Sequence, residues 1–522
     1  MLVVKRNGLD LGLLTRYSIY GLLFLIFQLR LLKKNLFNNF LWLDESGQVW
    51  MSLGQNHFSP VGTESHGITH ILANNATYNL DPGGFTLLLR VWMELFGFDA
   101  PVLRLLPYFA YLLTFLLIQI AIIRTFRNSN LKEMATLVLI FVSTTPMVTY
   151  YAFEIRGYSF SLLLSTILFA TLSNYILNRS STNFLILCSF ICISISIRYT
   201  SISYCVAITF IVVILEIYSR NIRRFLLIVF STLCMSTGVV ISQLRFQFGG
   251  SADSYLDEHL LLGNSNNFTI LKDNFVGFPG FLRLIVVLLS LYILFSLRRL
   301  GISELLNRRE FIFSMVALLV TFFQISLSAL GIMPWHSSTR WAIEDLSFLF
   351  VFIILVNSDT LGSRLFSKGL IWSRYIKYLP SLFLISLLVL AFSRESGAAI
   401  VQRSSSLQIS KVLFSELNEK SKNHIVLIES NLYPTLRYNF ELDPTYKNIS
   451  YSWFSSSIHL FSNSKELGNL LVNPSERPLT IIASNQEWVH ETIDKSSLQC
   501  SSILDTSEMD SRAPHWFSLK GC

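Results

Sequence analysis

Blocks of about 20 consecutive apolar residues recur along the chain, and they constrain its fold more than any other feature. As an α-helix, a block of this length rises about 30 Å and crosses the hydrocarbon core of a bilayer. Only 14% of the 522 residues are charged, whereas a soluble protein uses about a quarter. The sequence therefore predicts an α-helical polytopic membrane protein with about eleven transmembrane helices. The expected spans are 14–32, 101–123, 133–151, 157–178, 183–197, 200–218, 225–243, 283–297, 311–331, 343–357 and 379–393.

The basic residues lie mainly at the ends of these blocks, where the positive-inside rule places them. The formal charge of +8 is therefore explained by membrane topology, and we expect no nucleic-acid partner. As one helix, the stretch 183–218 would be about 54 Å long, too long for a single span. A break at Arg198-Tyr199-Thr200 makes it a hairpin and places most basic clusters on one side. The amino terminus is then cytoplasmic, and the loops 33–99, 244–282 and 332–342 lie outside the inner or plasma membrane.

Two domains are expected: a membrane domain over residues 1–393 and a soluble extracytoplasmic α/β domain over 394–522. In the first domain, the outer loop 33–99 alternates aromatic and apolar residues with polar ones, which predicts amphipathic helices along the interface. In the second, short apolar runs predict strands and other segments have helical spacing. Cys500 and Cys522 both lie in this tail. They either form a disulfide or remain two free thiols. The expected strands are Ile425–Ile428 and Leu479–Ala483, and the expected helices are Lys465–Leu471 and Gln486–Ile493.

The adjacent carboxylates Asp44 and Glu45 follow the apolar run Leu41-Trp42-Leu43. In apolar surroundings near a membrane face, a carboxylate can be tuned to accept a proton at the working pH. Alternatively, the pair is a solvated turn at the start of an interfacial helix, where negative charge suits the helix dipole. The sequence thus makes this pair a candidate catalytic base.

Two further outer segments carry candidate ligands. Asp81, before Pro82, either caps the helix that follows or faces a substrate, and spacing alone favours the cap. Glu154 and Arg156 lie in a turn between two expected spans, where they line a polar cavity or pair with each other. The fork of Arg156 suits a phosphate, although an Arg at a helix end also simply snorkels to the interface.

A last outer segment, Trp335–Trp341, precedes a late span. Arg340 is a second candidate phosphate ligand. His336 is either a proton carrier or an ordinary surface residue.

The order of these motifs resembles the GT-C superfamily of integral-membrane glycosyltransferases, in the branch of protein O-mannosyltransferases and lipid A aminoarabinose transferases. The resemblance covers roughly residues 15–390. The chain departs from the family at Asp81, which replaces a frequent His, at Gly83, which replaces a second Pro, and at Trp341, which replaces a Tyr. The matching elements are Trp42-Leu43-Asp44-Glu45, Asp81-Pro82-Gly83 with Trp92 and Phe96-Gly97, Tyr151 with Glu154, Arg156 and Tyr158, and Arg340-Trp341.

This resemblance implies a GT-C-like fold and an inverting transfer, on the outer face of the membrane, of a sugar from a polyprenyl-phosphate donor to a hydroxyl of a glycan, lipid or protein. Asp44 would be the general base, supported by Glu45, and Glu154 would position the acceptor or the base. Arg156 and Arg340 would hold the donor phosphate. Asp81, Tyr158 and His336 would complete the substrate site. No cofactor is required, although some members use a divalent cation and one remains possible here.

Two other classes remain alternatives. A lipid-linked sugar flippase or transporter would place its main charges in mid-span, whereas Asp44, Glu154 and Arg340 are expected at outer ends. A polysaccharide polymerase or ligase would typically have its large outer loop late in the chain, whereas here the first loop is large.

Overall fold

We describe the chain from a computed structural model. The structure describes residues 11–36, 41, 43–56, 65–79, 81–125, 129–220, 280–329, 343–349, 351, 425–429, 433–438, 457–461, 464–471, 479–483, 502–505 and 517–520. The expected spans 225–243 and 379–393, most of the expected span 343–357, and the helix expected at Gln486–Ile493 lie outside these residues. The number of eleven spans and the domain boundary at residue 394 therefore stay predictions.

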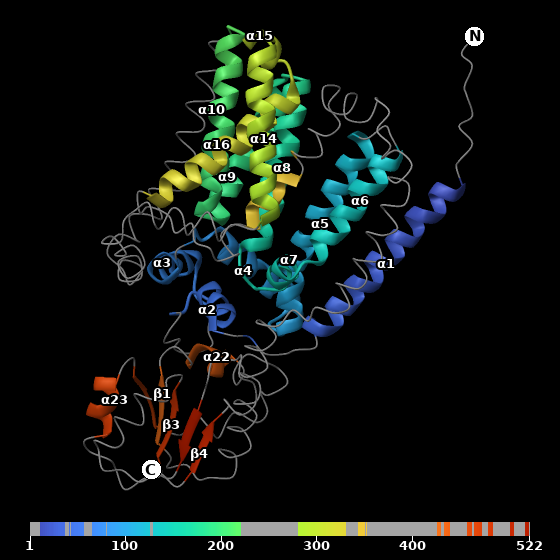
Figure 1. Cartoon of the computed structure of the whole chain (residues 1–522). Helices are drawn as coiled ribbons and strands as arrows, with labels where there is room; N and C mark the ends of the chain where they lie inside the picture. The colour runs from blue at the N-terminus through green and yellow to red at the C-terminus, as the bar shows by residue number, and fades with distance from the viewer. Residues whose placement is uncertain are drawn as a thin grey trace.

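Long apolar helices form a bundle at one end of the molecule (Figure 1). Within the described residues, four helices are long and apolar enough to cross a membrane: Ala100–Thr125, Tyr158–Leu177, Tyr199–Tyr218 and Arg309–Ser326. Large apolar side chains such as Leu116, Leu294 and Phe322 are more than half exposed on the bundle, as expected of a surface in contact with lipid. The helices of this part are α1 (Leu11–Leu36), α5 (Ala100–Thr125), α6 (Ser129–Thr144), α7 (Pro146–Ala152), α8 (Tyr158–Leu177), α9 (Ser181–Ile197), α10 (Ile202–Tyr218), α14 (Gly280–Arg299), α15 (Ile302–Leu305) and α16 (Arg309–Ala329).

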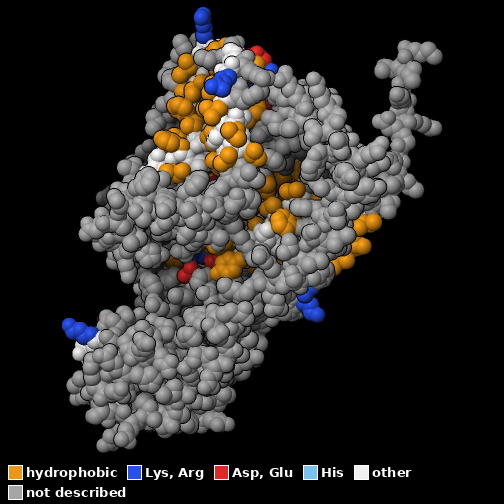
Figure 2. All heavy atoms as spheres, in the orientation of Figure 1, with side chains coloured by type: hydrophobic (Ala, Val, Ile, Leu, Met, Phe, Trp, Pro, Cys, Tyr) orange, Lys and Arg blue, Asp and Glu red, His pale blue; other side chains and the backbone are white. Residues whose placement is uncertain are grey.

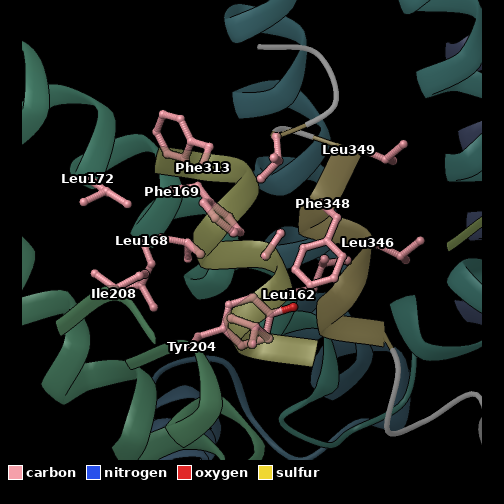
Figure 3. Packing of buried hydrophobic residues seen from close by; sticks show 14 of the residues in the cluster. Leu162, Leu168, Phe169, Leu172, Tyr204, Ile208, Phe313, Leu346, Phe348 and Leu349 are labelled. Atoms are coloured by element: carbon pink, nitrogen blue, oxygen red, sulfur yellow. The ribbon is translucent and has the colours of Figure 1, made fainter. Parts of the chain in front are cut away.

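Helix α8 is the centre of this bundle and packs against α5, α9 and the short 3-10 helix η3 (Ile343–Ser347). Figure 3 shows Phe169 of α8 among Tyr204 of α10, Phe313 of α16 and Phe348, which follows η3. These rings are fully buried. The aromatic cluster therefore joins segments that lie far apart in the sequence into one core.

Two helix breaks decide where the site lies. The break expected at Arg198 is confirmed, because α9 ends at Ile197 and a short 3-10 helix, η1 (Tyr199–Ser201), leads into α10. The single span expected over 133–151 is wrong, because it divides into α6 and α7 at Thr145. Pro146 begins α7, and Thr145 before it is extended at φ −64° and ψ 145°, since a residue that precedes proline avoids the helical region.

The described residues of the first long loop form the helices α2 (Leu43–Ser52), α3 (Ile68–Tyr78) and α4 (Gly84–Phe96). Helices were predicted in this loop, and their place along the membrane interface stays a prediction. They lie at the end of the bundle that faces the C-terminal strands (Figure 1). Val49 and Trp50 of α2 pack with Phe85 and Leu89 of α4 in a second apolar cluster. Helix α4 also approaches α9 closely, because a Cβ at Gly84 would lie 2.3 Å from the carbonyl oxygen of Ser196.

The C-terminal part contains a five-stranded sheet in the order β2-β1-β3-β5-β4. Strand β1 pairs parallel with β2 and β3, whereas β5 pairs antiparallel with β3 and β4. The expected strands at Ile425 and Leu479 and the expected helix at Lys465 are all present. The elements are β1 (Ile425–Glu429), α22 (Tyr433–Arg437), β2 (Ser457–Phe461), α23 (Ser464–Leu471), β3 (Leu479–Ala483), β4 (Ser502–Asp505) and β5 (Phe517–Lys520).

Candidate functional site

Asp44 lies in the first turn of α2, and its carboxylate faces the turn between α7 and α8. Its Oδ2 is 3.2 Å from Nη1 of Arg156 in that turn. The side chains of Asp44 and Arg156 are 26% and 16% exposed, so both are reachable by a ligand while being partly shielded from water. This pair joins two of the predicted site residues directly.

Glu45 points away from Asp44, because successive residues of a helix lie about 100° apart. Its Oε2 is 3.1 Å from Nη2 of Arg104 in α5, and both side chains are fully buried. The backbone N–H of Ile155 donates to the other oxygen of Glu45 at 3.4 Å. Glu45 thus links α2 to α5 and to the turn that carries Arg156.

Arg198 is at the centre of the site, although the sequence indicated it only as a helix break. Its side chain is fully buried, with Nε 3.4 Å from Oδ1 of Asp81 and Nη1 3.2 Å from Oε1 of Glu344. Its guanidinium carbon lies 4.6 Å from the ring centre of Tyr158. Arg198 therefore connects the start of α4, the start of α8 and η3. A charged residue between two apolar blocks was the signal that could have identified it.

Glu344 is the second residue that the sequence did not single out. It is fully buried in η3. The hydroxyl of Thr200 donates to its Oε1, and that of Ser201 donates to Oε2 at 3.3 Å. Next to it, Asp345 accepts hydrogen bonds from Tyr204 at 2.6 Å and Gln324 at 3.0 Å. Two adjacent acids at the start of an apolar block were the signal in the sequence.

Asp81 does not cap α4, so the interpretation that spacing favoured is wrong. The N-cap is Gly83, without a side-chain hydrogen bond to the helix. Asp81 instead has its carboxylate beside Arg198, while its backbone carbonyl accepts a hydrogen bond from Asn75 at 2.8 Å. The Asp81 side chain is 14% exposed.

Tyr158 lies beside both Arg156 and Arg198, and Glu154 lies near Arg156. Tyr158 begins α8 and is buried, with its ring centre 5.8 Å from the guanidinium carbon of Arg156. Glu154 is also buried, in the same turn. Burial alone would lower the pKa of Arg156, but Tyr158, Asp44, Asp81 and Glu154 together outweigh it and raise that pKa. Arg156 consequently remains a cation.

His336 and Arg340 fall in 330–342, outside the described residues. Their place in the site stays a prediction.

The described residues thus bring together carboxylates from four segments around the guanidinium groups of Arg156 and Arg198. In Figure 2, acidic, basic and apolar side chains are visible in a hollow between the bundle and the C-terminal part. Among the described residues, no group of three or more His, Cys, Asp or Glu side chains is arranged to hold a metal ion. The geometry provides a partly exposed carboxylate beside a cationic fork, which suits proton acceptance next to an anion.

No protein-family model matches the chain, and no curated protein matches it in sequence. Among solved structures, the chain is similar to the crystal structure of ArnT from Cupriavidus metallidurans in the apo state, with a TM-score of 0.48 and 11% sequence identity. The match covers 97% of this chain and 98% of that one.

Proposed function

We propose that this chain is a GT-C-type membrane glycosyltransferase, which transfers a sugar from a polyprenyl-phosphate donor to a hydroxyl acceptor on the outer face of the membrane. The observation that carries the proposal is the Asp44–Arg156 pair, with 3.2 Å between a partly exposed carboxylate and a partly exposed guanidinium. Both residues belong to the motifs through which the sequence resembles this superfamily. The acceptor is a glycan, a lipid or a protein.

In the proposed step, the acceptor hydroxyl attacks the anomeric carbon of the sugar and Asp44 takes the hydroxyl proton. A bond forms between the acceptor oxygen and the anomeric carbon, while the bond from that carbon to the phosphate oxygen breaks. The electron pair of the broken bond remains on the polyprenyl phosphate. A single displacement of this kind inverts the anomeric configuration.

Arg156 stabilises the charge that develops on the leaving phosphate. Asp44 contacts one terminal nitrogen of Arg156, and the planar fork has further N–H groups that can bind phosphate oxygens. One guanidinium thereby places the donor phosphate close to the base. Arg340 is proposed as a second phosphate ligand, Glu154 and His336 as acceptor-side groups, and Glu45 as the residue that holds α2 for Asp44.

Arg198 acts as a positioning residue in this scheme, because its side chain is fully buried. Its contacts with Asp81 and Tyr158 fix the first residues of α4 and α8 around the Arg156 turn.

A divalent cation is not required in the proposed step. The carboxylates of Asp44, Asp81 and Glu344 are each within 3.4 Å of a guanidinium nitrogen, so a cation bound there would compete with an arginine. A cation, if one were used, would supply the charge neutralisation that Arg156 provides here. We expect activity to change less than about twofold with a chelator, far below what loss of an essential metal causes.

The test is release of free polyprenyl phosphate from a panel of polyprenyl-phosphate sugars, in membranes that contain wild-type protein or Asp44→Asn. We expect wild-type release and a loss of roughly a hundredfold or more in the variant, as for removal of a general base. Glu94→Gln is the matched control, because Glu94 is an acid of the same loop that is 57% exposed and forms an ion pair with Arg90 of its own helix.

Two results would contradict the proposal. Equal release by Asp44→Asn and wild type would remove Asp44 as the base. Transbilayer movement of the lipid-linked sugar without release of polyprenyl phosphate would favour a flippase.

A further inference from the structure

Helix α22 of the C-terminal part lies against α2, the helix that carries Asp44 (Figure 1). The two helices are nearly 400 residues apart in the sequence, since their hydrogen-bonded residues are separated by 389 positions. Nothing in the motifs of the membrane domain predicts this contact.

The hydroxyl oxygens of Ser46 in α2 and Thr435 in α22 are 3.0 Å apart and share a hydrogen bond. Both side chains are fully buried. A buried hydrogen bond between two short hydroxyl side chains permits little rotation of one helix against the other. Ser46 is two residues beyond Asp44, so the contact restrains the turn of α2 that carries the proposed base.

Aromatic contacts extend the interface along α2. The guanidinium carbon of Arg437 lies 5.3 Å from the ring centre of Trp50, which is fully buried one turn further along α2. Tyr438 packs into the same apolar cluster as Trp50, and its hydroxyl donates to the carbonyl oxygen of Phe98 at 2.6 Å. Helix α22 is therefore anchored to α2 and to the segment that follows α4.

Helix α2 is consequently held on two sides. Glu45 binds Arg104 of α5 on one side, and Ser46 and Trp50 contact α22 on the other. Asp44 is left on a third side, toward Arg156. A helix of ten residues has little stability of its own, so these tertiary contacts determine how it is oriented.

We propose that α22 is a positioning element of the active site: the Ser46–Thr435 and Trp50–Arg437 contacts set the orientation of α2 and thereby the place of Asp44. The C-terminal part is then a component of the catalytic unit rather than an appendage to it. This inference rests on the proposed role of Asp44, and it identifies Thr435 and Arg437 as residues that act on the reaction through α2.

The test compares Thr435→Val with Thr435→Ser, since Val keeps the shape and Ser keeps the hydroxyl. We expect kcat of Thr435→Val to fall roughly fivefold to tenfold, the size of one lost buried hydrogen bond, with KM for the donor within twofold. Thr435→Ser should restore most of the wild-type kcat. Lys465→Ala, at an exposed position of α23, is the control and should match wild type.

Amide hydrogen exchange supplies a readout that does not depend on activity. In Thr435→Val, amides of α2 should exchange faster while those of α8 do not change. Ser46→Ala/Thr435→Val should resemble either single variant, because both remove the same bond. Unchanged exchange in α2, or unchanged kcat with a raised KM, would overturn the positioning role. Absence of polyprenyl-phosphate release by wild type would instead overturn the proposed function. The exchange data would still show whether the contact between α2 and α22 stabilises α2.

Discussion

Asp44 and Glu45 are neighbours in the sequence but lie in different environments. Asp44 is 26% exposed beside Arg156, whereas Glu45 is fully buried against Arg104. A buried carboxylate without a partner is costly, and so is a buried guanidinium. The two consecutive carboxylates therefore have different roles: Asp44 is the proposed base, and Glu45 stabilises the fold. They face different surroundings because α2 turns about 100° from one residue to the next.

Glu45→Gln should consequently destabilise the protein, since it leaves Arg104 charged and buried without its counter-ion. We expect a loss of about 3 kcal/mol, as for breaking a buried ion pair, seen as a lower melting temperature in detergent. Asp44→Asn should melt within a few degrees of wild type. Equal melting temperatures for wild type and Glu45→Gln would contradict this division of roles.

Arg156→Lys tests the fork rather than the charge. Lysine keeps the positive charge near Asp44, but it cannot bind two phosphate oxygens in the plane of a guanidinium. We expect kcat/KM for the donor to fall about tenfold to a hundredfold, measured by release of polyprenyl phosphate. Arg308→Lys is the control, because Arg308 lies just after α15 and pairs with Glu304, an exposed residue of that helix. Wild-type kcat/KM in Arg156→Lys would give Arg156 a structural role.

The sequence motifs predicted part of this site and missed its centre. Asp44 and Arg156 were identified because each lies in a motif at an expected outer end, and the structure brings them together. Arg198 and Glu344 were missed because each interrupts or begins an apolar block, where a charge indicates a boundary. Their pairing depends on how the break between α9 and α10 packs against η3, which no local pattern encodes. Asp81 was wrongly assigned to a helix cap because its actual partner, Arg198, is distant in the sequence.

At the scale of elements, hydropathy located the described helices well because lipid requires long apolar segments. It did not locate the division of 133–151, since α6 and α7 are both apolar and only Pro146 marks the break. Nor did it predict the docking of α22, because the pairing of Ser46 with Thr435 joins two ordinary polar residues. Contacts between distant elements are decided by shape, which composition does not reveal.

The approach of α4 to α9 gives a prediction at this scale. In Gly84→Ala, the new Cβ would lie 2.3 Å from the carbonyl oxygen of Ser196, so the backbone must move. We expect a loss of about 1–3 kcal/mol, as for overpacking, with lower activity because α4 follows Asp81. Gly21→Ala in α1 is the control, since a Cβ there meets nothing within 4 Å. A melting temperature for Gly84→Ala equal to that of Gly21→Ala would contradict the close approach.

At the scale of the whole molecule, the contact between α2 and α22 restricts the topology. Ser46 and Thr435 share a hydrogen bond, and the Tyr438 hydroxyl donates to the carbonyl of Phe98, which predicts that the first long loop and the C-terminal sheet lie on the same side of the membrane. Helix α15 lies at the opposite end of the bundle from both (Figure 1). These contacts predict which parts of the chain share a side, and the distribution of Lys and Arg predicts which side that is.

Cysteine labelling in intact cells tests both the shared side inferred from the α2–α22 contact and the side predicted from the Lys and Arg residues. Lys465→Cys in α23 should react with a membrane-impermeant maleimide from outside, because Lys465 is exposed and the C-terminal part is expected to be extracytoplasmic. Glu304→Cys in α15, whose side chain is 52% exposed, should react only after the membrane is permeabilised. The unsubstituted chain measures labelling of the native cysteines. Reversed labelling would show that the charge rule assigns the wrong side while the α2–α22 contact holds. Labelling of both positions from outside would place α15 and α23 on one side, and would contradict the arrangement of the bundle itself.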